Sequence, residues 1–432
     1  MTPVAAQPMS ESTSAKTTTM VIVAWVVAAV FHFYQYSLRS APSVMMADLS
    51  AAFGISTLAV ASISGLFYYG YAPFNLVAGA AIDELGPRRV LPIGAVVVAI
   101  GVMLFATGDP SAASVGRLLQ GVGAAFAAVG GIYMASKYFP ASQTATLVGA
   151  TQMFGMAGGA AGQFAVAPIL GAGVSWKLLW AAMSVAGIAL AVLLAFVLPK
   201  KEGLARTGWL KPAGLATYQV LKNPQSILCG LIAGLLFIPT TIFGMIWGIQ
   251  YLQEAHGFDY GTAVMRSAAV PLGWIIGCPL LGYLSDRVGR RKPVIVGGAL
   301  VLLACLGWIL FGRPGVFPPY TLGLLAGVAS GAAMLPYSVI KEANPAEFGG
   351  TATGVINFLN FTLSALLAPV FANLLHRTSH GADQRALTHY QMAFIPMLVG
   401  VSLAIVLTFV LRETGPAAKR QSEAAHVHGG FH

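Results

Sequence analysis

The chain has 432 residues, of which 57% are hydrophobic and only 9% are charged. An ordinary soluble domain has about 25% charged residues, so this chain is too poor in charge to cover a soluble surface. The composition excludes a soluble enzyme, a disordered chain and a secreted disulfide scaffold. It predicts an all-α integral membrane protein whose main partner is the lipid bilayer.

Twelve apolar runs of about 20 residues, the length that crosses a bilayer as a helix, follow one another along the chain. We predict membrane spans at Met20–Pro42, Ser56–Ala80, Val90–Thr107, Ala112–Tyr138, Gln143–Leu170, Trp176–Leu198, Gln225–Tyr251, Gly261–Leu284, Pro293–Gly312, Phe317–Ile340, Gly350–Leu375 and Thr388–Leu411. Two six-helix halves result, residues 20–198 and 225–411, joined by a polar linker at residues 199–224.

Charge predicts the orientation of these spans. With both termini in the cytoplasm, seventeen of the 24 Lys and Arg residues lie in cytoplasmic segments, counting Lys137 at the cytoplasmic end of the fourth span, four lie outside and three lie deeper within spans. This bias follows the positive-inside rule. Residues 1–19 and 412–432 are then cytoplasmic tails, the first disordered and without a signal-peptide cleavage pattern. We expect a multi-pass protein of a bacterial inner membrane, and the scattered basic clusters indicate no nucleic-acid partner.

The two halves carry the same loop. Residues 79–89, after the second span, and residues 282–292, after the eighth, both read G-x-x-x-D-x-x-G-x-R-[RK]. Internal repeats of this kind are how secondary transporters build a site between two halves. The repeat therefore predicts pseudo-symmetric halves.

The doubled loop resembles the signature of the major facilitator superfamily, and the resemblance extends over about residues 20–411. It implies a twelve-helix bundle that transports a solute and is not an enzyme. It also implies that Asp83, Arg88, Asp286 and Arg291 form gating ion pairs on the cytoplasmic face. Residues 117–121 resemble the weaker R-x-x-Q-G pattern of the same family, which leaves Arg117 with either a gating or a structural role.

The first span carries a polar face. His32, Tyr36 and Arg39 stand at positions i, i+4 and i+7, on one side of a helix. No Asp or Glu lies inside any predicted span, so an anionic substrate could supply the missing charge for Arg39. The stretch from Tyr34 to Arg39, which ends Y-x-x-R, is also similar to the first helix of anion-transporting branches of the family. Arg266, in the other half, is a candidate second cation across the cavity; for both arginines, a side chain reaching the outer interface is the alternative.

Other polar residues fall on spans that line the cavity of such bundles. They are substrate-contact candidates, although contacts between helices are the more frequent role of such residues. The set is Tyr68, Gln152, Trp247, Gln250, Trp274, Asn357 and Asn360.

The sequence thus predicts a monomeric secondary transporter that moves a small organic anion by alternating access. No nucleotide-binding, cofactor or metal pattern is present, and Cys229, Cys278 and Cys305 are too scattered for a zinc site. His32 could carry a coupling proton; otherwise the anion exchanges for another anion. The alternatives are proton-coupled efflux of lipophilic compounds, a metal or siderophore carrier, and a non-transporting receptor on a transporter scaffold.

Overall fold

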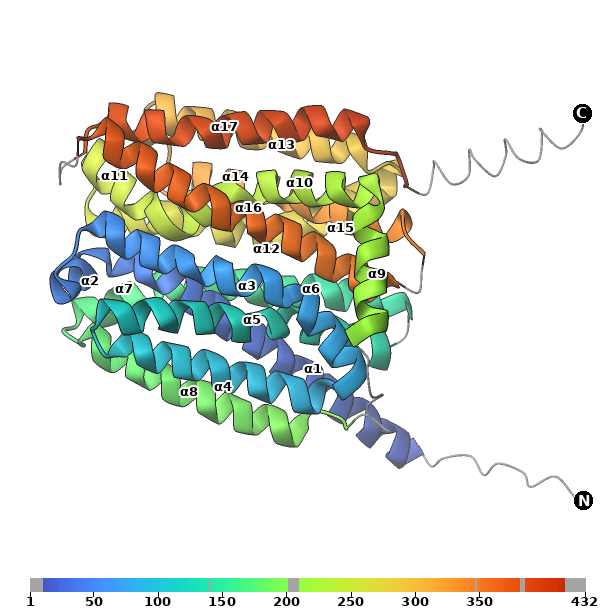
Figure 1. Ribbon diagram of the computed structural model, residues 1–432. Coiled ribbons are helices and arrows are strands. Elements are labelled where there is room, and N and C mark those ends of the chain that lie inside the picture. Colours follow the sequence, from blue (N-terminus) through green and yellow to red (C-terminus); the bar gives the residue numbers. More distant parts are fainter. Residues whose placement is uncertain (1–10, 140, 201–209, 346–347, 381–384, 416–432) are drawn as a thin grey trace, which may run out of the picture.

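The protein is a bundle of helices, and the part of the chain that the structure describes contains no β-strand. The computed structural model describes residues 11–415 except 140, 201–209, 346–347 and 381–384. Most of the long helices run side by side from one end of the bundle to the other (Figure 1). α1 begins and α17 ends at the same end, which we call the termini end; the opposite end is the far end.

The first half of the chain contributes six long helices. They are α1 (Glu11–Ser40), α3 (Thr57–Leu85), α4 (Pro87–Ala106), α5 (Pro110–Tyr138), α6 (Ala141–Phe164) and α8 (Trp176–Val197). Short helical segments lie at the far end, namely η1 (Ala41–Val44), α2 (Met46–Phe53) and α7 (Val166–Gly171).

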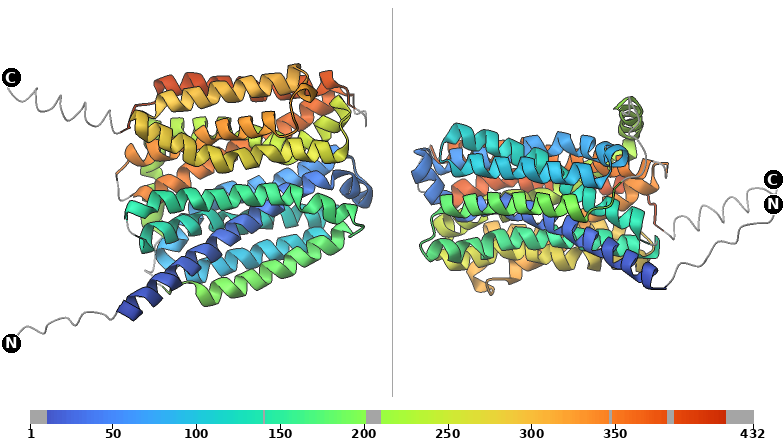
Figure 2. Two further views of the ribbon diagram at one scale, coloured as in Figure 1. Left: turned by 180° about the vertical axis from the view of Figure 1, so that it is seen from behind. Right: turned by 90° about the horizontal axis from the view of Figure 1, so that it is seen from below.

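The second half repeats this plan with two broken helices. The first broken helix comprises α10 (Pro224–Pro239), η2 (Thr240–Trp247) and α11 (Gly248–His256), and the second comprises α14 (Thr321–Ser330), η4 (Gly331–Met334) and α15 (Leu335–Glu342). The others are α12 (Tyr260–Val288), α13 (Lys292–Phe311), η3 (Pro314–Val316), α16 (Gly349–Thr378) and α17 (Leu387–Val410). The two halves lie side by side (Figures 1 and 2). A further helix, α9 (Leu210–Lys222), falls within the predicted linker and runs across the termini end.

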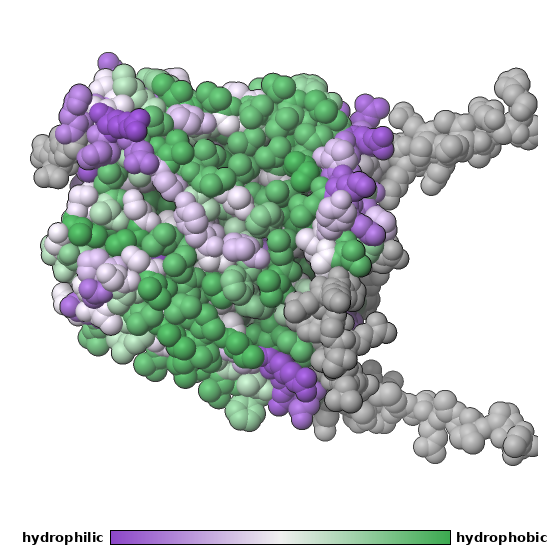
Figure 3. Space-filling view, viewed as in Figure 1, coloured by the Kyte–Doolittle hydropathy of each residue, from purple (hydrophilic) through white to green (hydrophobic). Residues whose placement is uncertain are grey.

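The surface of the bundle is that of a membrane protein. Eleven helices in the described ranges are long and apolar enough to cross a bilayer, and α3 becomes a twelfth when taken with α2, to which it is bent by 105°. Figure 3 shows a broad apolar band, with hydrophilic residues gathered toward the two ends. Large apolar side chains stand outward in this band; Phe196 is 74% exposed and Phe409 is 66% exposed. Lipid is the environment that suits such a surface, which confirms the predicted all-α membrane fold.

Local sequence chemistry sets where the helices begin and end. Gly86 has a φ of 79°, which glycine adopts readily, and Pro87 then opens α4. The Asp259 carboxylate accepts a hydrogen bond from the Thr262 amide at 2.9 Å and caps α12. Hydrogen bonds from Thr262 hold the pKa of the Asp259 carboxyl below its ordinary value. Gly289, with a φ of 72°, ends α12 within the second copy of the repeated loop.

Glycines let α6 lie directly against α1. A Cβ atom at Gly158 would overlap the carbonyl oxygen of Phe33, and one at Gly155 would lie 2.6 Å from the His32 ring. Because neither glycine carries a side chain, the polar face of α1 approaches α6 closely. This contact places His32 beside Gln152.

The break in the first helix of the second half exposes a backbone acceptor. Pro239 precedes η2, which is a π-helix of eight residues. A proline cannot donate to the helical ladder, and π segments often occur at functional sites. Within η2, the Gly244 carbonyl accepts a 2.7 Å hydrogen bond from Gln163 on α6. This bond joins the two halves.

Candidate functional site

A small cavity lies between the two halves. Its volume is about 50 Å³, enough for a few water molecules. No Asp or Glu is among the described residues that line it. Its lining comprises His32, Tyr36, Tyr71, Ala128, Ile132 and Gln152 from the first half, and Phe237, Trp274, Ala333, Met334, Tyr337, Lys341, Thr353, Asn357, Asn360 and Phe361 from the second.

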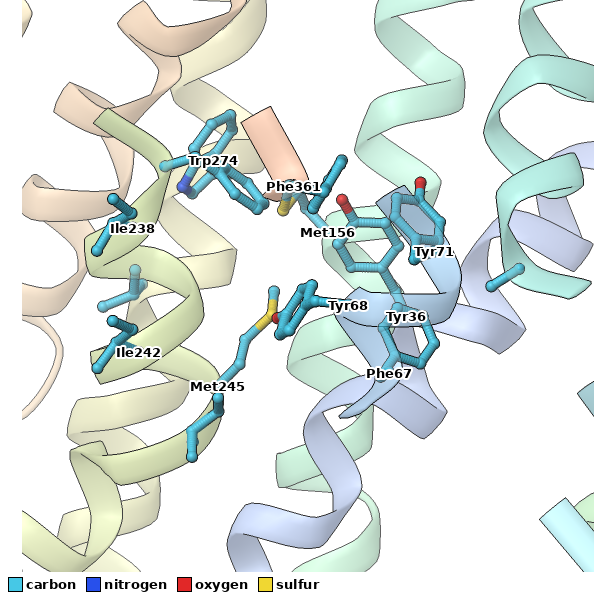
Figure 4. Close-up of a cluster of buried hydrophobic side chains, with 14 of the residues drawn as sticks. Tyr36, Phe67, Tyr68, Tyr71, Met156, Ile238, Ile242, Met245, Trp274 and Phe361 are labelled. Atoms are coloured by element: carbon cyan, nitrogen blue, oxygen red, sulfur yellow. The ribbon is translucent and has the colours of Figure 1, made fainter. Parts of the chain in front are cut away.

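Arg39 lies next to this cavity, enclosed by five aromatic rings that we call the arginine cage. Its guanidinium carbon is 4.1 Å from the centre of the Tyr36 ring, and the other four rings are Phe67, Tyr68, Tyr71 and Phe361 at 4.6, 5.6, 4.7 and 5.2 Å. Phe361 belongs to the second half, so the cage closes across the interface (Figure 4). Rings within about 6 Å attract a cation through their negative faces.

The cage leaves Arg39 short of hydrogen-bond partners. Arg39 is only 2% exposed. Its Nη2 atom donates to Gln35 Oε1 at 3.1 Å, whereas Nε and Nη1 have no acceptor among the described residues. No carboxylate of the described chain forms an ion pair with it. A buried cation in this condition is costly unless an anion binds to it.

The cage also separates the central cavity from a larger recess. His32 and Tyr36 of α1 line the central cavity, whereas Ser43 and Val44 of η1, which directly follows α1, line a recess of about 1020 Å³ at the far end. Arg39 lies between these two pairs of residues in the chain. We call the larger recess the outer vestibule; both halves contribute to its walls.

A directional chain of hydrogen bonds fixes the proton on His32. Arg39 can only donate, so Gln35 must turn its oxygen toward Arg39 and its amide nitrogen toward His32. That nitrogen, Nε2, donates to His32 Nδ1 at 3.1 Å. His32 Nδ1 is therefore unprotonated, and the ring carries its proton on Nε2, which donates to Gln152 Oε1 at 3.0 Å. Gln152 in turn approaches the Met334 sulfur of the second half at 3.9 Å.

The second half provides a polar wall to the cavity. The Tyr337 hydroxyl donates to Asn357 Oδ1 at 2.6 Å and accepts from Asn360 Nδ2 at 3.1 Å. The Oδ1 atom of Asn360 is buried without a partner among the described residues. Trp274 lies on the same lining and donates from Nε1 to Thr240 at 2.8 Å. This wall offers hydroxyl and amide groups to a polar ligand.

The structure thus brings six of the predicted contact residues to one cavity and a seventh to the cage. His32, Tyr36, Gln152, Trp274, Asn357 and Asn360 line the cavity, and Tyr68 stacks on Phe361 in the cage. Arg39 adjoins the cavity behind the cage.

Three other predicted contact residues lie elsewhere. Arg266 does not face Arg39: its guanidinium lies 4.4 Å from the Phe258 ring and donates to the Phe317 carbonyl, all within the second half. Trp247 packs against Phe371, away from the central cavity. Gln250 lines the outer vestibule. The rotation of each helix about its axis directs these three side chains away from the centre. The boundaries of a span do not predict that rotation.

Sequence analysis missed several lining residues. Lys341 was assigned to a loop beyond the tenth span, but α15 continues through it and carries it into the cavity. Tyr337 stands one helical turn earlier, and that i, i+4 spacing was the signal that both residues share a face. Gln35, which was not among the predicted contact residues, links His32 to Arg39.

The second copy of the repeated loop forms a compact ion-pair network at the termini end. Arg291 pairs with Asp286 at 2.5 Å and with Glu342 at 3.1 Å, and it also donates to Ser285. Burial alone lowers the pKa of Arg291, but its bonds to Asp286 and Glu342 outweigh burial and raise this pKa above its ordinary value. All these residues, and Glu413, which accepts from the Arg291 amide, belong to the second half.

For the first copy, the side chain of Asp83 lies outside the described residues, and Arg88 is half-buried near the start of α4. Arg117 is buried and donates to the Ser64 and Leu38 carbonyls and to Gln120. These acceptors tie α1, α3 and α5 together within one half. The geometry therefore favours the structural role for Arg117 over the gating role.

A polar cluster joins the halves at the far end. Arg385 pairs with Glu254 at 3.4 Å and donates to Thr57 at 3.2 Å, across the interface. Gln250 also donates to Thr57, at 3.3 Å, and Tyr390 donates to Glu254 at 2.8 Å. Sequence analysis placed Glu254 beyond the seventh span, whereas α11 extends to His256 and includes it.

Comparisons with known proteins agree with this architecture. The family model of the Major Facilitator Superfamily matches residues 25–369. A hexuronate transporter of Bacillus subtilis is 26% identical, covering 78% of this chain and 83% of that protein. A probable sulfoacetate transporter of Cupriavidus necator is 23% identical, covering 82% of this chain and 86% of that protein. A membrane sensor protein of Salmonella typhimurium is 24% identical, covering 90% of this chain and 91% of that protein.

A solved structure shows the same fold. It is a bacterial homologue of the human lysosomal transporter Spinster, with a TM-score of 0.67, 14% identity, and coverage of 90% of this chain and 96% of that one. Together with the family match over more than half of the chain, this similarity confirms the predicted twelve-helix architecture. The chain belongs to the major facilitator superfamily, a family of non-enzymatic membrane carriers.

Proposed function

We propose that the protein is a secondary active transporter of a small organic anion and works by alternating access, with both termini in the cytoplasm. One observation indicates that the substrate is an anion. Arg39 is buried, two of its nitrogen atoms have no described acceptor, and no carboxylate is among the described residues that line the adjoining cavity. A substrate carboxylate would supply the missing charge and accept two parallel hydrogen bonds from the guanidinium.

Two relatives support this substrate class by their names. Hexuronate and sulfoacetate are both organic anions, and each of those transporters aligns with more than three quarters of this chain. Neither relative identifies the substrate here. They make a carboxylate-bearing solute the natural first class to test.

The substrate binds, in this proposal, between the polar face of α1 and the wall of the second half. Arg39 holds the anionic group, and His32, Tyr36 and Gln152 border it on the first half. Tyr68 in the cage, and Trp274, Asn357 and Asn360 on the cavity lining, complete the site. The cage must open for the substrate to reach Arg39, because Tyr36, Tyr71 and Phe361 stand between the guanidinium and the cavity.

Proton coupling runs through His32 and Gln35. An additional proton can bind only at His32 Nδ1, the acceptor of the Gln35 amide. Accepting it requires Gln35 to turn its nitrogen away, and the turn removes Gln35 Oε1 from Arg39. Proton binding thereby frees Arg39 for a carboxylate, so proton and anion favour each other's binding. Exchange of one anion for another is the alternative mode.

Transport into proteoliposomes tests the proposal. Labelled carboxylates, hexuronate and sulfoacetate among them, should accumulate with a proton gradient or exchange with internal anion, whereas neutral sugars and organic cations should not. The similarity to a membrane sensor favours one second candidate, a receptor on the same scaffold. A receptor would bind an anion without carrying it, so binding with neither uptake nor counterflow would replace the transporter proposal.

A further inference from the structure

Lys341 is a second cation on the central cavity. It lies near the end of α15, in the half opposite to Arg39, and its side chain is exposed while lining the cavity. His32, at the same cavity, is 1% exposed. The cavity is therefore open at the termini end, beside Lys341, and closed toward the arginine cage.

No carboxylate neutralises Lys341 within the described part of the chain. The described residues of the cavity lining include no Asp or Glu. Glu342, the next residue, is already engaged, because it accepts from Arg291 at 3.1 Å and from Thr414 at 2.6 Å. Lys341 lies one residue before the end of a membrane-spanning helix and lines a cavity, and cations that face a cavity in such helices often mark substrate pathways.

The Cα–Cβ bonds of the two cations tilt toward each other. In a helix these bonds tilt toward the start of the helix, and α1 and α15 run in opposite directions (Figure 1). The Cα–Cβ bond of Arg39 thus tilts toward the termini end, where its guanidinium donates to Gln35, and that of Lys341 tilts toward the far end. Gln152 contacts both His32 and Met334, so these two residues lie at about the same height along the bundle axis. Each cation is seven residues beyond that level in its own helix, so their Cα atoms lie about 20 Å apart along the bundle axis. The gap between the two charged groups is shorter than this, because both side chains reach into it.

Polar groups fill part of this interval. Tyr337 stands one turn from Lys341 on α15 and is bonded to Asn357 and Asn360 of α16. Thr353, one turn from Asn357, also lines the cavity. A ligand that reached from one cation to the other would meet hydroxyl and amide groups along the second half.

We propose that Lys341 is a second anion-binding residue and that the substrate is an elongated molecule with an anionic group at each end. One group binds Arg39 in the first half, and the other binds Lys341 in the second. This inference rests on the proposed transport of an organic anion. The ammonium is a point charge on a flexible stem and places little demand on geometry, so it accepts a carboxylate, a sulfonate or a phosphate alike.

The repeat provides a matched control. Residues 137–146 and 341–353 share a second repeated pattern, in which a Lys is followed by a Pro and then by Thr-Ala-Thr. Lys137, at the end of α5, occupies in the first half the place that Lys341 occupies in the second. It is exposed, its ammonium donates to the Tyr133 hydroxyl at 2.8 Å, and it is not on the cavity lining. Lys137→Gln removes the same charge from the same end of the bundle.

Equilibrium binding to the purified protein tests the inference. The probes are dicarboxylates from succinate to suberate, each compared with the monocarboxylate of equal length. Wild type and Lys137→Gln should prefer the longer dicarboxylates, and Lys341→Gln should lose roughly tenfold to a hundredfold in their affinity and with it the preference. Lys341→Arg, which keeps the charge, should retain the preference.

Each contrary result identifies which statement fails. If Lys341→Gln keeps the wild-type preference for longer dicarboxylates, Lys341 is not a substrate contact and the proposed function stands. The same conclusion follows if wild type shows no preference for dicarboxylates while an Arg39→Ala variant still loses monocarboxylate binding. If wild type binds neither series, both the inference and the organic-anion proposal are overturned.

Discussion

Replacing Thr57 by Val tests how the halves are held together at the far end. Thr57 begins α3, and its Oγ1 accepts from Arg385 Nη2 at 3.2 Å and from Gln250 Nε2 at 3.3 Å, both in the second half. Val keeps the branched shape of Thr and removes only the hydroxyl. Both bonds are lost, whereas Arg385 and Gln250 each keep Glu254 as a partner.

The expected shift is moderate. A hydrogen bond from a charged donor contributes about 1.5–3 kcal/mol and a neutral one about 0.5–1.5 kcal/mol. Because both donors keep Glu254, the lower ends of these ranges apply, giving about 2 kcal/mol and a roughly thirtyfold change in an equilibrium constant. The variant should therefore favour conformations in which the far ends of the halves are apart.

Thiol labelling measures this shift. Val44 lines the outer vestibule and is 5% exposed, so a Val44→Cys probe should react slowly while the far end is closed. In a background whose three native cysteines are replaced, Thr57→Val should raise the labelling rate by up to about thirtyfold. Thr57→Ser, which keeps the hydroxyl, should label like the parent. Equal or slower labelling of Thr57→Val would refute the reasoning.

Three further outcomes are expected. Asp286→Asn should impair uptake with normal membrane insertion, because Arg291 loses its closest anionic partner; normal uptake would remove Asp286 from the gate. His32→Gln should flatten the pH dependence of uptake while counterflow exchange persists, and an unchanged pH profile would leave His32 as a packing residue. Gly158→Val should lower the thermal unfolding temperature, since its side chain would overlap the Phe33 carbonyl; an unchanged temperature would contradict that close contact.

The sequence was sufficient for the architecture because membrane spans depend on length and apolarity, which are local properties. The repeated loop also predicted the two halves without any knowledge of packing. The polar face of α1 could be found for a similar reason: His32, Tyr36 and Arg39 share one helix, and their spacing alone places them together. The cage around Arg39 could not be found, since Phe67, Tyr71 and Phe361 come from two other helices.

The errors concern rotation and helix ends. Arg266 was predicted to face the cavity, but α12 is rotated so that Arg266 faces Phe258 and Phe317. Lys341 was not predicted as a lining residue, because the predicted end of the tenth span, Ile340, lies one residue before it and so assigned it to a loop. The π-helix after Pro239 leaves no periodic signal, yet it presents the Gly244 carbonyl to Gln163.

The central claim is that Arg39 selects an anion. The most direct measurement is the dissociation constant of the anion identified by the uptake screen, determined by equilibrium binding to purified wild type, Arg39→Lys and Arg39→Ala. Removing a buried charge-assisted bond should weaken Arg39→Ala roughly 10- to 150-fold, and Arg39→Lys should also be weak because it lacks the bidentate fork. Equal dissociation constants in all three proteins would contradict the account.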